Sequence, residues 1–180
     1  MIETIRIGHL LREAVAAPYR NLVTRPTGAA VRDRIEEALA RSDCLTALLD
    51  FSDIELLDLS CADEIVAKLL LADITGGGRF VVLQGLREDQ HEAIEHVLTH
   101  HRLAVAAVAR GSGGPRLLGW ASSDARAAFA CIGDRGSLAA ADLARALDWA
   151  EGRARDALDA LALHRLVRRE GEQYHPLTTA

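Results

Sequence analysis

Short apolar runs with strand character alternate with helical segments through residues 1–110. In the helical segments, apolar side chains recur every three or four positions. Because helices that connect successive strands allow those strands to run parallel, the alternation predicts an α/β fold with a mostly parallel sheet flanked by helices. Thr27 is expected to cap the helix at 28–40. Strands are expected at 2–8, 21–24, 45–51, 79–85 and 103–109, and helices at 9–15, 28–40, 62–74 and 88–101.

The chain changes character after residue 110. Residues 111–114, GSGG, indicate a turn or a flexible joint, and a short apolar run follows them. From Ser122 onward the pattern is mostly helical, and two strand-like pieces around residues 170–172 predict a closing hairpin. The expected organisation is an α/β domain at 1–110, a linker or hairpin at 111–121 and a small domain at 122–180.

The composition excludes a general affinity for polyanions. The net charge of the 180-residue chain is −5, so binding to nucleic acid would need a local basic surface. The three cysteines are widely spaced in apolar contexts, which indicates buried thiols in a reducing compartment. The N-terminus lacks the pattern of a signal peptide, and no apolar run is long enough to span a bilayer. We therefore expect a cytoplasmic protein without a membrane partner.

Apolar residues recur at fixed spacing between residues 137 and 177. Leu143 and Leu147 belong to one expected helix, Trp149 to a tight turn, and Leu158 and Leu161 to the inner face of a second helix. Two strand-like pieces follow, at 166–169 and 174–177. In this register the segment resembles a bacterial winged helix-turn-helix domain. The resemblance implies that the second helix enters the major groove of DNA and that the hairpin, or wing, meets phosphates.

Five arginines of this segment are the candidate DNA contacts, because guanidinium groups bind phosphates and base edges. Glu151 and Asp156 share the outward surface of the second helix and would repel the DNA backbone, and Ala150 stands where a capping Ser or Thr is usual. A winged helix used for dimerisation or for docking to a protein therefore remains an alternative. The candidates are Arg153, Arg155, Arg165, Arg168 and Arg169.

Residues 46–70, TALLDFSDIELLDLSCADEIVAKLL, join a buried strand to a turn and a helix. A later strand, FVVLQG, and a later helix, HEAIEHVLTH, follow in the same order as in the STAS-like family. The segment 20–109 resembles this family, which includes the bacterial anti-sigma-factor antagonists. The resemblance implies a STAS-like sheet with flanking helices that binds a regulatory protein or a second copy of itself.

Asp58 and Ser60 are the candidate regulatory residues of the turn. In partner-switching relatives the serine directly after the aspartate accepts a phosphate, and that position is Leu59 here. Ser60 is instead expected to cap the following helix through the backbone N–H of Asp63. A phosphate on Ser60 would gain from the helix dipole but would face several carboxylates, so the cap is favoured over the phosphorylation site.

The other candidate motifs do not assemble into a catalytic site. His96 and His100 share a helix face but lack nearby Cys or carboxylate ligands, so no metal is expected. Cys61 lies beside acidic groups that raise a thiol pKa, which argues against a nucleophile. Asp63 and Glu64 are adjacent and should diverge on a helix rather than act as an acid/base pair. Residues 76–78, GGG, lack the spacing of a phosphate-binding loop.

The sequence thus predicts a non-enzymatic bacterial transcription regulator without a cofactor. In this hypothesis a STAS-like domain mediates protein interaction and a winged helix binds double-stranded DNA. The alternative is a protein-interaction module of an anti-sigma partner-switching system that does not bind DNA. A small-ligand or enzymatic pocket at the strand ends is a third hypothesis.

Overall fold

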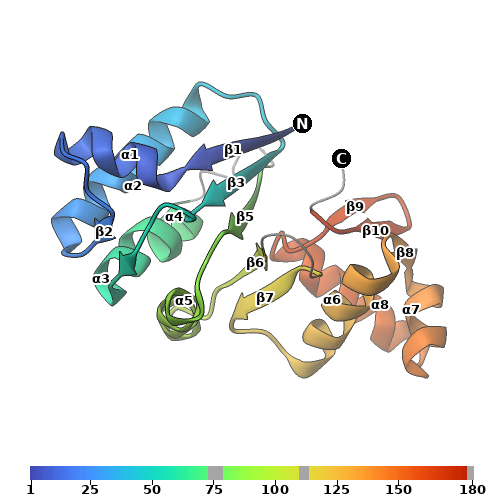
Figure 1. Cartoon of the computed structure of the whole chain (residues 1–180). Helices are drawn as coiled ribbons and strands as arrows, with labels where there is room; N and C mark the ends of the chain where they lie inside the picture. The colour runs from blue at the N-terminus through green and yellow to red at the C-terminus, as the bar shows by residue number, and fades with distance from the viewer. Residues whose placement is uncertain (73–78, 110–113, 178–180) are drawn as a thin grey trace.

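The computed structural model describes residues 1–72, 79–109 and 114–177, and its centre is a five-stranded sheet (Figure 1). Its strand order is β1-β3-β5-β6-β7; neighbouring strands up to β6 run parallel, and β7 pairs antiparallel with β6. The predicted mostly parallel α/β sheet is therefore confirmed. The strands are β1 (Ile2–Arg6), β3 (Thr46–Asp50), β5 (Phe80–Gln84), β6 (Ala104–Val108) and β7 (Arg116–Gly119).

The described helices that connect the parallel strands pack on one face of this sheet. The parallel strands lie side by side in chain order, so right-handed crossovers bring each connecting helix to the same face. On that face Leu49 and Leu83 of the strands share one buried core with Leu11, Ile35 and Ile94 of the helices. The helices are α1 (Ile7–Val15), α2 (Arg25–Ala40), a segment formed by α3 (Leu59–Ala62), η1 (Asp63–Ala67) and α4 (Lys68–Leu71), and α5 (Glu88–His100).

Two short strands, β2 (Asn21–Leu22) and β4 (Leu56–Leu57), pair in parallel and bring the starts of α2 and α3 together. Helix α2 begins at Arg25, with Pro26 in its first turn, where a missing backbone N–H costs no hydrogen bond. The expected cap at Thr27 is therefore wrong. Thr24 occupies the N-cap position without a side-chain cap bond, and its hydroxyl lies 3.1 Å from that of Thr27.

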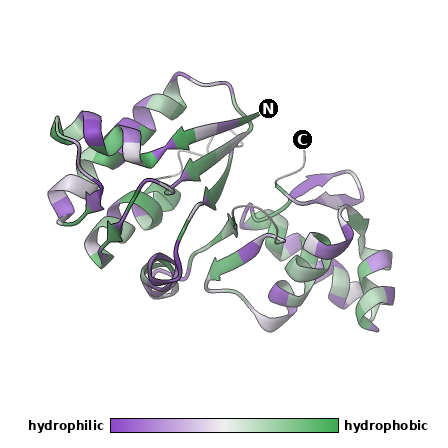
Figure 2. Ribbon diagram, in the orientation of Figure 1, coloured by the Kyte–Doolittle hydropathy of each residue, from purple (hydrophilic) through white to green (hydrophobic). Residues whose placement is uncertain are grey.

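The C-terminal segment packs on the opposite face of the sheet. A second buried core joins Val82 and Ala106 of that face to Phe129, Leu143 and Leu158 of the C-terminal helices. Figure 1 shows this segment beside β6 and β7, and Figure 2 shows hydrophilic residues recurring along its helices. Its elements are α6 (Ser123–Arg135), β8 (Leu138–Ala139), α7 (Ala140–Leu147), α8 (Glu151–Leu163), β9 (Arg168–Glu170) and β10 (Gln173–His175), and its three strands form an antiparallel sheet in the order β8-β10-β9.

Most expected elements are present with small shifts of their ends. The short apolar run after the predicted turn at 111–114 forms β7, and residues 116–119 of the predicted linker or hairpin pair antiparallel with β6. The end of the helix expected at 62–74, the glycines at 76–78 and residues 111–113 lie outside the described residues.

We expect Phe129→Ala to lower the free energy of unfolding by about 3–5 kcal/mol, because it opens a cavity in the second core. Since that core includes β5 and β6, amide hydrogen exchange should accelerate in both strands as well as in α6. Urea unfolding and hydrogen exchange measure these two effects. Trp120→Ala is the control, because Trp120 is exposed. Faster exchange confined to α6 would show that the C-terminal segment does not share its core with the sheet.

Candidate functional site

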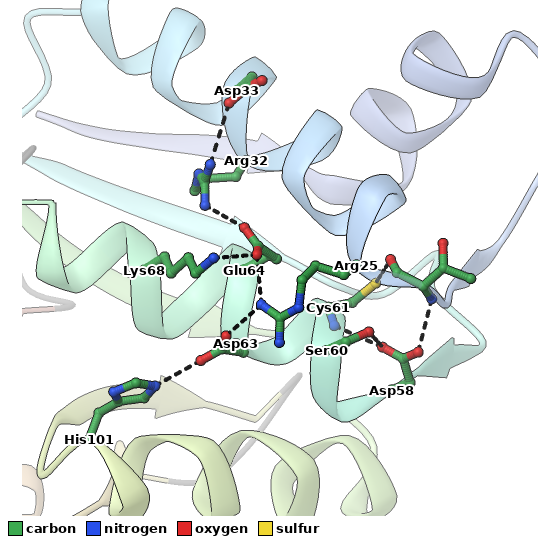
Figure 3. Close-up of polar contacts among 11 residues, drawn as sticks. Arg25, Arg32, Asp33, Asp58, Ser60, Cys61, Asp63, Glu64, Lys68 and His101 are labelled. Atoms are coloured by element: carbon green, nitrogen blue, oxygen red, sulfur yellow. Dashed lines mark hydrogen bonds and ion pairs between the residues drawn. The ribbon is translucent and has the colours of Figure 1, made fainter.

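Asp58 organises the turn between β4 and α3 (Figure 3). It is the N-cap of α3, and its carboxylate accepts hydrogen bonds from the backbone N–H of Cys61 at 2.8 Å and from the hydroxyl of Ser60 at 2.8 Å. Its second oxygen accepts from the backbone N–H of Thr24 at 2.9 Å. One carboxylate thus joins the start of α3 to the start of α2.

The prediction that Ser60 caps the helix is wrong. Helix α3 begins at Leu59, so Ser60 already lies in its first turn and its hydroxyl donates to Asp58. Asp58 takes the cap because its backbone is extended directly after β4, which aims the carboxylate at the free N–H groups of the turn. The two candidate regulatory residues are therefore in direct contact.

Cys61 lies behind this turn as a buried thiol. Its Sγ is 3.1 Å from the backbone oxygen of Thr24. Burial and, after it, the charge of Asp58 raise the pKa of Cys61 to about 12. The expected direction is confirmed, and the thiol is unsuited to act as a nucleophile near neutral pH.

Glu64 is a buried carboxylate surrounded by three cations. Arg25 Nη1 lies 2.7 Å from one of its oxygens, and Arg32 and Lys68 also bind it. Arg25 Nη1 lies 2.8 Å from Asp63 as well. The expectation that Asp63 and Glu64 diverge is wrong, because in the π-helical turn η1 both reach the same guanidinium (Figure 3).

These carboxylates are held in their charged forms. For Glu64, burial opposes ionisation, but the hydrogen bonds from Lys68 and Arg25 outweigh it and lower the pKa. For Asp63, burial is likewise outweighed by hydrogen bonds from Arg25 and from His101, whose Nε2 lies 2.8 Å away, and the pKa is lowered. Neither group can serve as a general acid near neutral pH, and together they tie η1 to α2 and to the end of α5.

An open groove of about 540 Å³ lies between this helical segment and α5. His96 and His100, which the sequence places on one helix face, both line it, and His101, which sequence reasoning missed, joins them from the C-cap of α5. Within the described residues, no group of three or more His, Cys, Asp or Glu side chains is arranged to hold a metal ion. The other residues that line the groove are Arg25, Leu59, Ser60, Asp63 and Val97.

The second candidate surface is formed by α8 and the β9–β10 hairpin. Residues 148–150 connect α7 to α8, with Asp148 in the left-handed conformation. Ala150 is the N-cap of α8 and makes no side-chain cap bond, as the sequence predicts. Arg153, in the first turn of α8, lies over the ring of Trp149 at 4.2 Å and binds Asp124 of α6 at 2.8 and 2.9 Å.

Arg155 and Arg169 converge on one carboxylate of the hairpin turn. Arg155 Nη1 lies 3.0 Å from Glu172, and Arg169 Nη2 lies 3.8 Å from its other oxygen. Arg155 also binds Glu151 at 3.2 Å, and Arg169 binds Asp159 at 3.1 Å. The structure therefore places these two predicted arginines on one continuous surface and pairs both with acidic side chains.

The remaining predicted arginines do not join that pair. Arg168 Nε lies 2.9 Å from Glu170, an ion pair whose geometry does not make a hydrogen bond. Arg165 follows α8 in a left-handed conformation and lines a cavity of about 290 Å³ beside the main sheet. The five candidates are thus spread over the start of α8, the hairpin and the sheet-facing end of α8.

Tyr174 is a residue of this surface that sequence reasoning assigned only to the wing. Its buried hydroxyl donates to Asp159 at 2.5 Å, and Arg169 lies 5.5 Å from its ring centre. Burial and, after it, the hydrogen bond to Asp159 raise the pKa of Tyr174 to about 12. The phenol therefore stays protonated and fixes the position of the Asp159 carboxylate.

No protein-family model, curated protein or solved structure matches the chain. Among the described residues, no helix has the length and apolar character needed to cross a membrane.

We expect Asp58→Ala to lower the free energy of unfolding by about 2–3 kcal/mol, because two backbone N–H groups and a hydroxyl lose a charged acceptor. Ser60→Ala removes only one donor to that carboxylate and should cost less than about 1 kcal/mol. Chemical denaturation measures both values. A larger loss for Ser60→Ala would restore Ser60 as the residue that holds the helix start.

The lowered pKa of Asp63 predicts a defined dependence of stability on pH. The unfolded carboxyl group takes up its proton at a higher pH than the folded one, so its contribution is complete above its ordinary pKa and is lost as the pH falls through the folded value. Asp63→Asn should therefore differ most from the natural protein above about pH 5, and the difference should shrink as the pH falls below the ordinary pKa of an aspartate.

Thermal or urea unfolding at several pH values measures that difference. Asp33→Asn is the control, because the Asp33 side chain is exposed on α2 and lies 3.8 Å from Arg32. A difference between Asp63→Asn and the natural protein that stays constant from neutral to acid pH would contradict the linkage.

Proposed function

We propose that this chain is a non-enzymatic regulatory protein in which a STAS-like α/β unit carries a winged helix that binds double-stranded DNA. The observation that carries the proposal is the succession α7, the turn at 148–150, α8 and the β9–β10 hairpin, with β8 pairing alongside. This is the order of elements in a winged helix-turn-helix, in which the second helix and the hairpin meet DNA together.

The first part of the proposal is supported by the strand-turn-helix unit at β3, β4 and α3. The order of strands and helices there agrees with the resemblance to the STAS-like family, and the helices on one face leave the other to a second element. The carboxylates and the thiol near the turn are held in fixed protonation states by ion pairs and burial. These properties favour a scaffold for binding over an acid/base or nucleophilic site.

DNA contact is supported by the placement of Arg153 and Arg155 at the exposed start of α8 and of Arg169 on the neighbouring hairpin. Arg155 and Arg169 share Glu172, so the helix and the hairpin present their guanidinium groups side by side. Guanidinium groups donate hydrogen bonds to DNA phosphates and to the edges of guanine bases.

A protein-interaction module without DNA binding is the second candidate. It is favoured by Leu56 and Leu59, whose relative exposures are 50% and 49% although both are large and apolar. They lie on either side of Asp58, at the turn whose serine accepts a phosphate in the partner-switching relatives that the segment resembles. Exposed apolar side chains beside a groove are typical of such contacts.

Selection from a random pool of duplex DNA tests the first function. We expect the full chain to enrich a sequence, and Arg153→Ala with Arg169→Ala to weaken binding to the enriched duplex by about tenfold or more and to lower the salt slope. The matched control is Arg6→Ala with Arg41→Ala, which removes the same charge from exposed positions on β1 and beside α2. No enrichment by the natural chain would refute DNA recognition and leave the interaction module.

A further inference from the structure

We propose that Asp159 and Glu172 are specificity-determining residues of the surface formed by α8 and the β9–β10 hairpin. They neutralise Arg155 and Arg169, so phosphate charge alone does not hold DNA there, and binding requires base contacts in addition. This inference rests on the proposed function, and it assigns a role to acidic residues that would otherwise only oppose that function.

The geometry places the two carboxylates where DNA phosphates would have to bind. Glu172 accepts from Arg155 at 3.0 Å and lies 3.8 Å from Arg169, and Asp159 accepts from Arg169 at 3.1 Å. Each guanidinium on this surface therefore has an internal acidic partner. The other two arginines of α8 and β9 also have acidic partners: Arg153 pairs with Asp124 and Arg168 pairs with Glu170.

The two carboxylates are held with different strength. Asp159 accepts a hydrogen bond from the buried hydroxyl of Tyr174, so it cannot turn away when a phosphate approaches Arg169. The side chain of Glu172 has a relative exposure of 72% and lies next to Gly171 in the hairpin turn. Glu172 can be displaced from Arg155 at little cost, whereas Asp159 remains in place.

The consequence for binding follows from counterion release. Affinity for random DNA comes almost entirely from cations that neutralise phosphates, and each carboxylate that stays beside an arginine cancels part of that gain. An exposed ion pair contributes little because water solvates both charges well, so a ligand that adds base contacts can still displace Glu172. Acidic residues at these positions therefore weaken binding to random DNA more than binding to a sequence that offers base contacts.

Neutralising the two carboxylates tests the inference. Asp159→Asn with Glu172→Gln should raise the affinity for random duplex DNA about tenfold or more at low salt and steepen the salt dependence. The amide introduced by Asp159→Asn keeps an oxygen that can accept from Tyr174, so the fold should persist. The matched control is Glu13→Gln with Glu37→Gln, which makes the same change of charge at ion-paired positions on α1 and α2.

The inference is overturned if the neutralised protein binds random DNA no more tightly than the natural protein, or if the control gains equally. Adding Arg155→Ala and Arg169→Ala to the neutralised protein should remove the gain. If the double variant fails to fold, the affinity of Glu172→Gln alone for random duplex DNA tests the inference, because this exposed residue supports no buried group. A failure of the proposed function has a different signature, namely a natural chain that enriches no sequence from the random pool.

Discussion

The structure depends on a single sheet that must be buried on both faces. Its parallel strands lie in chain order, so right-handed crossovers place α1 to α5 on one face and leave the other without helices of its own. A parallel sheet needs cover on both sides, and the C-terminal segment supplies much of it through a core shared with Val82 and Ala106. The helices that carry the candidate DNA contacts are therefore fixed to the sheet by packing as well as by the chain.

Charge is arranged differently at the two candidate sites. At the start of α3, Asp58 and Glu64 are partly or fully buried and bind groups from neighbouring elements, so they act as fixed links between helices. On α8 and the hairpin, the arginines and carboxylates are exposed and pair across the surface. The first arrangement stabilises the fold, whereas the second sets how the surface responds to a charged partner.

The two candidate functions place the partner on different surfaces. DNA would bind α8 and the hairpin, and a regulatory protein would bind the turn at Leu56 and Leu59. Both surfaces belong to elements that pack on the same sheet, on opposite faces. In the proposed regulator, the shared sheet would connect the protein-binding turn to the DNA-binding helix.

The order and type of most elements follow from the amino-acid sequence, because hydrophobic periodicity reports which face of each segment is buried. The sequence also indicated the buried thiol of Cys61 and the missing cap at Ala150, since both follow from immediate neighbours. Three contacts became visible only in the folded chain: Asp58 caps α3, Arg25 joins Asp63 to Glu64, and Glu172 pairs with Arg155. These contacts join segments far apart in the chain or depend on where a helix starts. The residues around a charged group do not indicate which distant side chain will pair with it.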